Sequence, residues 1–215
     1  MKKIYIIHEN DEWIIPLDKE LRKIKPPFEK WHMDRTTIDM SKKPPSGVFY
    51  NRMSASSHSR GHRYAPEYTS TVLDWLEFHG RRLINNSQAL KLELSKSLQY
   101  KELQKEGIKV PMTVFAKDKS QLLKLGDNFP LPFLTKHNRA GKGLGIKFFK
   151  EYKIFEEYIK SEDFYESIDG ITLLQEYIKS KTDTIIRTEF VDSKFLYSVQ
   201  VDTSKGFELC PAESI

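Results

Sequence analysis

The sequence has 215 residues, and its 35 Lys and Arg against 30 Asp and Glu give a formal net charge of +5 at pH 7. This length accommodates one large domain or two small ones. A hydrophobic content of 39% with 12% aromatic residues excludes an intrinsically disordered chain. The apolar runs are far shorter than the ~20 residues that a membrane span needs, and no apolar leader follows Met1. With Cys210 as its single cysteine, the composition is typical of a soluble cytoplasmic protein.

The first part of the chain alternates short apolar runs with amphipathic segments. Runs of β-branched and aromatic residues predict strands, while Pro66 and Gly80 bracket a predicted helix. In chain order we expect a strand over 3–8, a short helix over 18–25, strands over 28–33 and 48–52, a polar loop over 53–64, a helix over 66–79 and a strand over 82–85. This alternation predicts a small open α/β layer.

The second part has a different rhythm. Ser87 is expected to cap a long helix over 88–106, which Gly107 ends. Beyond it we expect strands over 110–116, 133–137, 146–149 and 171–178, helices over 119–125 and 155–164, and a hairpin of strands 185–191 and 195–201. This order predicts a mixed α+β lobe. The sequence therefore predicts two domains, 1–86 and 87–215, and an α/β plus α+β fold class.

A glycine-rich segment carries the strongest chemical signal. The predicted strand ending at His137 delivers Lys136 into a turn with Lys142 and three alternating glycines, Gly141, Gly143 and Gly145. Backbone N–H groups in such a turn can cradle phosphate oxygens, but the same glycines can also serve only to close a β-hairpin. The spacing matches neither the Walker pattern nor the Gly-x-Gly-x-x-Gly loop, which makes a Rossmann nucleotide site improbable.

Two further features are weak in isolation. Lys96 lies on the predicted long helix, where most lysines are simply solvated. An apolar strand ends in Gln175 and Glu176, whose backbone groups could pair with an adenine edge while Tyr177 or Ile178 packs on its face. The alternative is a core strand that leaves its sheet.

These pieces occur together and in order, and in this combination the sequence resembles the ATP-grasp superfamily, closest to its glutamate-ligase-type, ribosomal-protein-modifying branch. The resemblance extends from about residue 83 to 212. It rests on Lys96, the Gly-Ile-Lys-Val-Pro-Met-Thr run at 107–113, the Pro-Phe-Leu-Thr-Lys strand at 132–136 with its glycine loop, Gln-Glu-Tyr-Ile at 175–178, and Arg187. It implies an N-terminal open α/β pre-ATP-grasp layer followed by an ATP-grasp fold.

The resemblance also implies roles for individual residues. Lys96 and Lys136 would contact the nucleotide phosphates under a lid formed by the glycine loop, and Arg187 would act catalytically on the phosphate or acyl-phosphate side. The adenine would lie against residues 175–178, and Asp183 would hold the ribose. The implied reaction is the activation of a carboxylate by ATP to an acyl phosphate, followed by attack of an amine. Small-molecule or peptide carboxylates and amines would be the substrates.

The C-terminal part departs from the family pattern. No Asp…Glu-x-Asn constellation occurs before residue 215, and the late carboxylates Glu208 and Glu213 do not supply one. The ATP-grasp fold is therefore expected to be incomplete, with Mg²⁺ ligands beyond residue 215, so that the chain is a fragment inactive alone. The alternative is a non-catalytic nucleotide-binding or scaffold module that keeps the fold.

The polar loop of the first domain follows a strand end, where open α/β sheets bind ligands. Arg52 and Arg60, aided by Arg63, could hold an anion or acceptor substrate by charge-assisted hydrogen bonds together with the hydroxyls of Ser54, Ser56 and Ser57. An ordinary exposed basic loop is the alternative. His58 and His62 are not expected to share a helix face, and a zinc site would need further ligands.

The charge pattern argues against other partners. Lys and Glu are interspersed, as in residues 91–105, whereas nucleic-acid binders cluster their basic residues and interleave aromatic ones. We therefore expect neither nucleic acid nor a membrane as a partner, and the sequence leaves homo-oligomerisation open.

Overall fold

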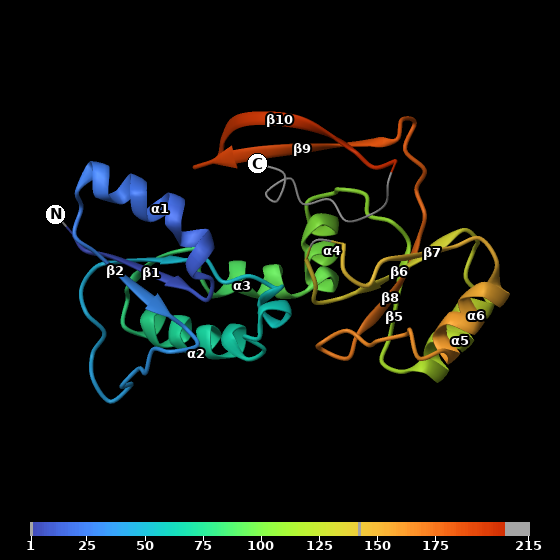
Figure 1. Ribbon diagram of the computed structural model, residues 1–215, viewed down its shortest axis with the longest axis horizontal. Helices are drawn as coiled ribbons and strands as arrows, with labels where there is room; N and C mark the ends of the chain where they lie inside the picture. Colours follow the sequence, from blue (N-terminus) through green and yellow to red (C-terminus); the bar gives the residue numbers. More distant parts are fainter. Residues whose placement is uncertain (1, 142, 205–215) are drawn as a thin grey trace. The chain divides into compact units, whose positions relative to one another are not determined.

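The computed structural model describes residues 2–141 and 143–204 and divides into two compact units, Met1–Gly107 and Ile108–Ile215 (Figure 1). Both units combine helices with a four-stranded sheet, which confirms the predicted α/β plus α+β class. Contacts assign residues 87–107, with the two helices they contain, to the first unit. The boundary between 86 and 87, which concerns where the ATP-grasp domain begins, stays a prediction.

The first unit is an open sheet of parallel strands in the order β2-β1-β3-β4. The strands are β1 (Ile4–His8), β2 (Phe28–His32), β3 (Val48–Asn51) and β4 (Arg82–Ile84). Helix α1 (Asp11–Ile24) covers one face, because Ile14 and Leu21 pack on Ile6. Helix α2 (Ala65–Phe78) covers the other, where its apolar side packs on Ile7 and Phe49 (Figure 1). Both faces of β1 are thus buried, as its apolar sequence predicts.

Helix α1 is longer than the sequence predicted. It begins at Asp11 because the Asn10 side chain accepts a hydrogen bond from the Trp13 N–H, which caps the first turn. Pro16 lies inside the helix and removes one backbone donor. The helix forms despite this lost hydrogen bond, because the burial of Ile14 and Leu21 holds it on the sheet.

The predicted long helix is two helices, α3 (Ser87–Leu94) and α4 (Lys96–Lys105). Ser95 separates them: its backbone is extended, with φ −143° and ψ 109°, and its side chain caps α4. The expected cap at Ser87 is also wrong, because Asn86 caps α3 and the Ser87 hydroxyl donates to Glu77. Serine and asparagine side chains accept hydrogen bonds from the free backbone N–H groups at a helix start and are less favourable inside a helix. This preference explains both differences.

The second unit holds an antiparallel sheet in the order β5-β8-β6-β7. Its strands are β5 (Thr113–Ala116), β6 (Phe133–His137), β7 (Lys147–Phe149) and β8 (Thr172–Glu176). Helices α5 (Lys119–Asp127) and α6 (Tyr152–Lys160) pack on one face (Figure 1). Strand β5 begins later than predicted, and Pro111, which lacks a backbone donor, lies just before it.

The core of this unit is built from aromatic rings. Phe155 of α6 is fully buried and contacts Phe133, Phe149 and Tyr152, with ring centroids 5.1, 5.2 and 5.9 Å apart. Gly126 of α5 lies directly against the Phe155 ring: a Cβ there would come within 2.3 Å of Cε1. The missing side chain at Gly126 therefore makes room for the ring.

A separate hairpin follows, formed by β9 (Thr184–Val191) and β10 (Lys194–Asp202) as predicted. Its turn places Asp192 and Ser193 in the left-handed region, with φ 50° and 61°. Two residues with positive φ match the right-handed twist of the flanking strands.

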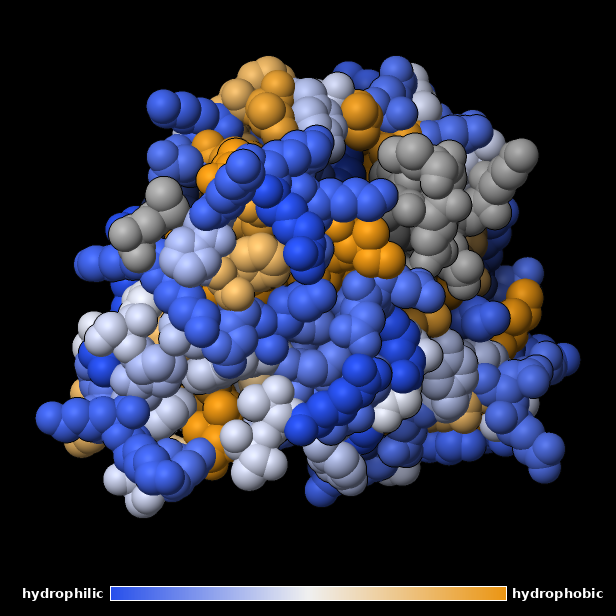
Figure 2. Space-filling model, turned by 60° about the vertical axis from the view of Figure 1, so that its left-hand side comes forward, coloured by the Kyte–Doolittle hydropathy of each residue, from blue (hydrophilic) through white to orange (hydrophobic). Residues whose placement is uncertain are grey.

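Figure 2 shows that hydrophilic residues dominate the displayed face of the molecule, with apolar residues in small separate groups. Within residues 2–141 and 143–204, no helix combines the length and apolar character needed to cross a bilayer.

Candidate functional site

Strand β6 of the second unit positions Lys136. Alternate residues of this strand face the helices, beginning with Phe133 in the aromatic core, so Lys136 projects from the opposite face of the sheet together with Gln175 of β8. Burial lowers the pKa of the Lys136 ammonium below its usual value. No ion pair to Lys136 occurs among the described residues. An underhydrated cation without a carboxylate partner is chemically suited to an anionic ligand.

The glycine loop runs from the end of β6 to the start of β7 and closes a hairpin, so the turn expected from the sequence is present. Gly143 and Gly145 have φ of 83° and 73°, in the region that favours glycine. At Gly145 a Cβ would come within 2.3 Å of the His137 ring, so the backbone approaches that imidazole too closely for a side chain. The loop therefore needs glycine at 145 for two independent reasons. Lys142 lies outside the described residues.

Asp169 anchors the beginning of this loop. Its carboxylate accepts hydrogen bonds from the Asn138 side chain at 2.6 Å, the Ser167 hydroxyl at 2.6 Å and the Ile171 N–H at 3.2 Å. The Asn138 N–H also donates to the Ile171 carbonyl at 3.0 Å. The residues that follow Lys136 are thus fixed to the turn before β8, while the glycines lie beyond the anchor.

The end of β8 presents backbone groups. The Tyr177 N–H donates to Pro132 at 3.2 Å, so in the alternating antiparallel ladder Glu176 occupies a position that makes no hydrogen bond to β6. Toward β5, the Met112 N–H donates to the Glu176 carboxylate at 2.9 Å and not to the Glu176 carbonyl. The Ile178 N–H has no partner among the described residues. A carbonyl at 176 and an N–H at 178 therefore remain available at and just beyond the carboxyl end of β8.

The remaining ATP-grasp-type residues lie elsewhere. Lys96 is the first residue of α4, in the first unit. Arg187 of β9 is exposed and pairs with Glu189 at 2.7 Å. Asp183 is exposed just before β9, and its carbonyl accepts from the Thr203 N–H at 2.8 Å. The roles of these three residues stay predictions.

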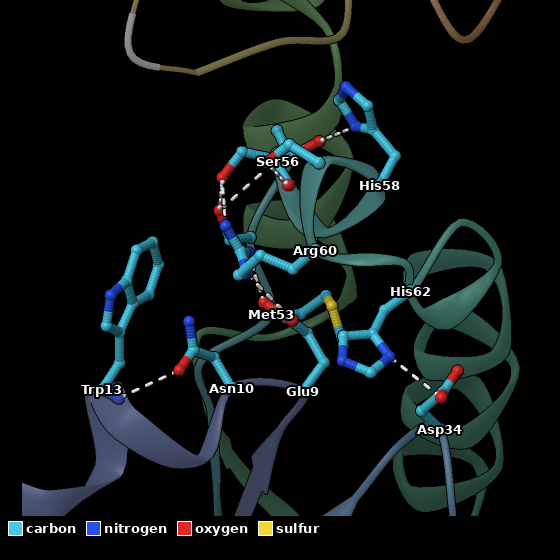
Figure 3. A network of polar contacts seen from close by, with 12 residues as sticks. Glu9, Asn10, Trp13, Asp34, Met53, Ser56, His58, Arg60 and His62 are labelled. Atoms are coloured by element: carbon cyan, nitrogen blue, oxygen red, sulfur yellow. Dashed lines mark hydrogen bonds and ion pairs between the residues drawn. The ribbon is translucent and has the colours of Figure 1, made fainter.

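In the first unit, the basic loop folds over the carboxyl ends of the strands (Figure 3). Arg60, in the 3-10 helix η1 (Ser57–Arg60), forms a two-pronged ion pair with Glu9, and its Nη1 lies 3.0 Å from the Ser56 hydroxyl. The Glu9 side chain is only 1% exposed, and Arg60 is the cation that pairs with it. The guanidinium also stacks on Trp13, 4.5 Å from the ring centre. Arg60 is therefore an internal part of this unit.

The other predicted loop residues divide into two groups. Arg52 is exposed and makes no ion pair among the described residues, and with Ser54 it lines a pocket of about 430 Å³. The Ser54 and Ser56 hydroxyls lie 3.0 Å apart. Ser57 is fully buried, and its hydroxyl has no hydrogen-bond partner among the described residues. The anion-binding hypothesis for this loop thus rests mainly on Arg52.

Two buried histidines end neighbouring strands of the same sheet. His8 and His32 are register partners at the last positions of β1 and β2. Burial lowers the pKa of His8, and burial likewise lowers the pKa of His32. Both imidazoles are thus predominantly neutral at pH 7.

A family model described as the RimK-like ATP-grasp domain matches residues 94–207, just over half of the chain. The chain belongs to the RimK-like ATP-grasp family. The resemblance stated from the motifs is thereby confirmed.

Solved structures agree with this RimK-like fold. A RimK domain ATP-grasp protein from Sphaerobacter thermophilus is 12% identical, with a TM-score of 0.67 over 98% of this chain and 77% of that one. The ATP-grasp ligase PsnB in complex with precursor peptide PsnA2 and AMPPNP is 14% identical (TM-score 0.57; 92% and 71% covered). D-alanine-D-alanine ligase from Helicobacter pylori is 18% identical (0.57; 97% and 73%). At these identities the likenesses show the fold. No curated protein matches the sequence.

Sequence reasoning missed two residues of this RimK-like chain that the structure makes prominent. Glu9 follows the apolar run of β1, and an acidic residue at the carboxyl end of a buried parallel strand was a signal for a polar role. Asp169 precedes Gly170, a pair that is typical of a turn in which the aspartate bonds the backbone two residues on. Neither position identifies its distant partner, Arg60 or Asn138.

We expect Arg60→Met to destabilise the first unit by about 3 kcal/mol, because it leaves the buried Glu9 charge without a partner. Urea unfolding followed by tryptophan fluorescence measures this, since Trp13, Trp31 and Trp75 all lie in the first unit. The exposed Arg52→Met is the control, with a change within ~0.5 kcal/mol. Equal effects of the two variants would contradict a structural role for Arg60.

Proposed function

We propose that this chain binds ATP on the second unit and acts in an ATP-dependent ligase that joins a carboxylate to an amine. Family membership supports the class of reaction. The observation that carries the nucleotide site is Lys136, a desolvated cation without a counter-ion among the described residues, placed immediately before a glycine loop. In this proposal the triphosphate is the anionic partner of the Lys136 ammonium.

In this proposal, backbone groups at and just beyond the end of β8 form hydrogen bonds to the base. Adenine presents a donor at N6 beside an acceptor at N1, which complements the Glu176 carbonyl and the Ile178 N–H. Guanine presents the reverse order, an acceptor at O6 and a donor at N1. We therefore propose that the edge formed by these two groups selects adenine, with Gln175 and Tyr177 nearby, and that Asp183 holds the ribose.

The proposed chemistry follows from the nucleotide position. A substrate carboxylate oxygen attacks the γ-phosphorus, the bond to ADP breaks, and an amine then displaces phosphate from the acyl carbon and loses a proton. Lys96, Lys136, Lys142 and Arg187 would neutralise the charge that moves between these groups, and residues 141–145 would exclude water. Arg52 and its neighbouring serines would hold a carboxylate of a small-molecule or peptide substrate.

The described residues do not identify a magnesium site. Among them, one group of three potential ligands lies close together, formed by His8, Asp11 and His32, and two of the three are imidazoles. Mg²⁺ prefers oxygen ligands in octahedral geometry, so this group does not fit it.

We expect ATP and ADP at 1 mM to raise the unfolding temperature by several degrees, because each binds only the folded state. GTP should raise it much less, because its base edge is reversed relative to adenine. Differential scanning calorimetry of the chain without and with Mg²⁺ makes the comparison. An unchanged transition with ATP, or equal shifts with ATP and GTP, contradicts the proposed nucleotide site.

Turnover is measured separately with hydroxylamine as the attacking amine. An acyl phosphate formed from amino acids or acidic peptides is then trapped as a hydroxamate, together with an equal amount of ADP. ADP release that depends on the carboxylate supports the ligase proposal. Binding of ATP without turnover, in the full-length gene product and across a panel of carboxylates, would instead favour a nucleotide-binding module.

A further inference from the structure

Three side chains with metal-binding atoms converge at the carboxyl ends of β1 and β2, within the first unit. His8 and His32 end the two strands in register, and their ring centres lie 5.1 Å apart. Asp11, the first residue of α1, places its Oδ1 4.0 Å from His8 Nδ1 and its Oδ2 4.0 Å from His32 Nε2. One potential ligand atom from each residue lies within 4.8 Å of the other two.

His8 is the more deeply buried of the two histidines in this group. His8 is 2% exposed, and because its contact with the Asn10 backbone falls short of hydrogen-bond geometry, neither ring nitrogen has a hydrogen-bond partner among the described residues. Buried polar atoms are nearly always paired, so an imidazole with two unpaired nitrogens requires an explanation. Its Nδ1 faces the Asp11 carboxylate from beyond hydrogen-bonding distance. A ligand placed between the two would satisfy both groups.

The spacing suits a small cation. Zn²⁺ holds imidazole nitrogen and carboxylate oxygen at about 2.0–2.2 Å, which puts tetrahedral ligands roughly 3.3 Å apart. The 4.0 Å separations here close to that value if the exposed Asp11 side chain rotates and its carboxylate leaves the ion pair with Arg35. Two imidazoles and one carboxylate form a donor set that favours zinc-like ions over Mg²⁺ or Ca²⁺.

The surroundings both support and oppose such an ion. The His62 ring lies 5.5 Å from the His32 ring, and its Nδ1 lies 2.9 Å from an Asp34 carboxylate oxygen, although the contact lacks hydrogen-bond geometry. Against binding, Arg35 pairs with Asp11 Oδ2 at 2.9 Å, and the Asp34 N–H donates to His32 Nδ1 at 3.3 Å. Coordination through His32 Nε2 would put the ring proton on Nδ1, which could then no longer accept a hydrogen bond from the Asp34 N–H. That hydrogen bond is long and therefore weak.

We propose that His8, Asp11 and His32 bind one divalent transition-metal ion of the zinc type, with a fourth position open to water or to His62. The ion would join β1, β2 and the first turn of α1. The inference does not depend on the proposed nucleotide site, because all its residues lie in the first unit.

The test is a titration of the untagged full chain with Co²⁺, which reports tetrahedral nitrogen and oxygen ligands by its visible absorption, followed by Zn²⁺ competition. We expect one equivalent of Co²⁺ to bind, Zn²⁺ to displace it, and Zn²⁺ to raise the unfolding temperature of the transition seen by tryptophan fluorescence. Asp11→Asn should weaken binding at least tenfold, and His8→Asn with His32→Asn should abolish it.

Matched controls separate this site from adventitious binding. His79→Gln removes an imidazole outside the group, and Cys210→Ser removes the single thiol; both should bind Co²⁺ like the unchanged chain. Asp11 is exposed, so Asp11→Asn is expected to fold even if the double histidine variant does not. Absence of stoichiometric binding to the unchanged chain, or an unchanged affinity in Asp11→Asn, overturns the proposal. Loss of binding in Cys210→Ser does the same.

Discussion

Lys136→Met is expected to weaken ATP and ADP binding roughly hundredfold while leaving the chain without nucleotide at least as stable as before. The ammonium is held in a poorly hydrated position and has no counter-ion among the described residues, so its charge opposes folding until an anion binds. Methionine keeps the length of the side chain and removes the charge. Binding decreases because the triphosphate loses a desolvated, charge-assisted contact.

Isothermal titration with ADP, together with calorimetric unfolding in its absence, measures the two effects separately. Lys153→Met is the matched control, since Lys153 lies on the exposed side of α6 in the same unit. The control should change neither quantity. Unaltered ADP affinity in Lys136→Met would remove Lys136 from the nucleotide site. A large loss of stability would show instead that the charge has a structural partner.

Phe155→Ala is expected to destabilise the second unit by about 4 kcal/mol. The ring is fully buried and bridges helix α6 to the strands through Phe133 and Phe149, so its removal leaves a cavity that the neighbouring rings cannot fill. Far-UV circular dichroism in urea follows the loss. Tryptophan fluorescence serves as the internal control, because all three tryptophans lie in the first unit.

The neighbouring glycine sharpens this experiment. Gly126→Ala should also destabilise the unit, because its Cβ would enter the space of the Phe155 ring. The double variant Phe155→Leu with Gly126→Ala should lose less stability than the sum of the losses in the two single variants, since the smaller side chain leaves room for the methyl group. Strict additivity would contradict direct packing between these two positions.

Much of the fold could be predicted because local patterns and tertiary packing agree. Strand β1 is an apolar run that its sheet buries, and the two-residue turn at Asp192 and Ser193 has the chemistry of a hairpin. The differences occur where one local signal competes with another. Helix α1 begins at Asp11 and not at the predicted residue 18, and Ser95 divides the single helix predicted over 88–106.

The candidate site was predictable only where its residues are close in sequence. Lys136 and the glycine loop after it form one continuous segment, and Gln-Glu-Tyr-Ile at 175–178 is another, so ordered motifs could identify both. Contacts such as Glu9 with Arg60 or Asp169 with Asn138 join residues far apart in the chain. The histidine pair depends on the register of β1 and β2, which no local pattern specifies.

The strand order of the second unit has a consequence for the nascent polypeptide. Strand β8 lies between β5 and β6, yet it is the last of the four to leave the ribosome. Until its buried leucines, Leu173 and Leu174, are synthesised, β5 has no hydrogen-bonded neighbour in that sheet and β6 pairs only with β7. Completion of this four-stranded sheet during translation must therefore await residue 176, and any chain terminated earlier would expose two unpaired edges to aggregation.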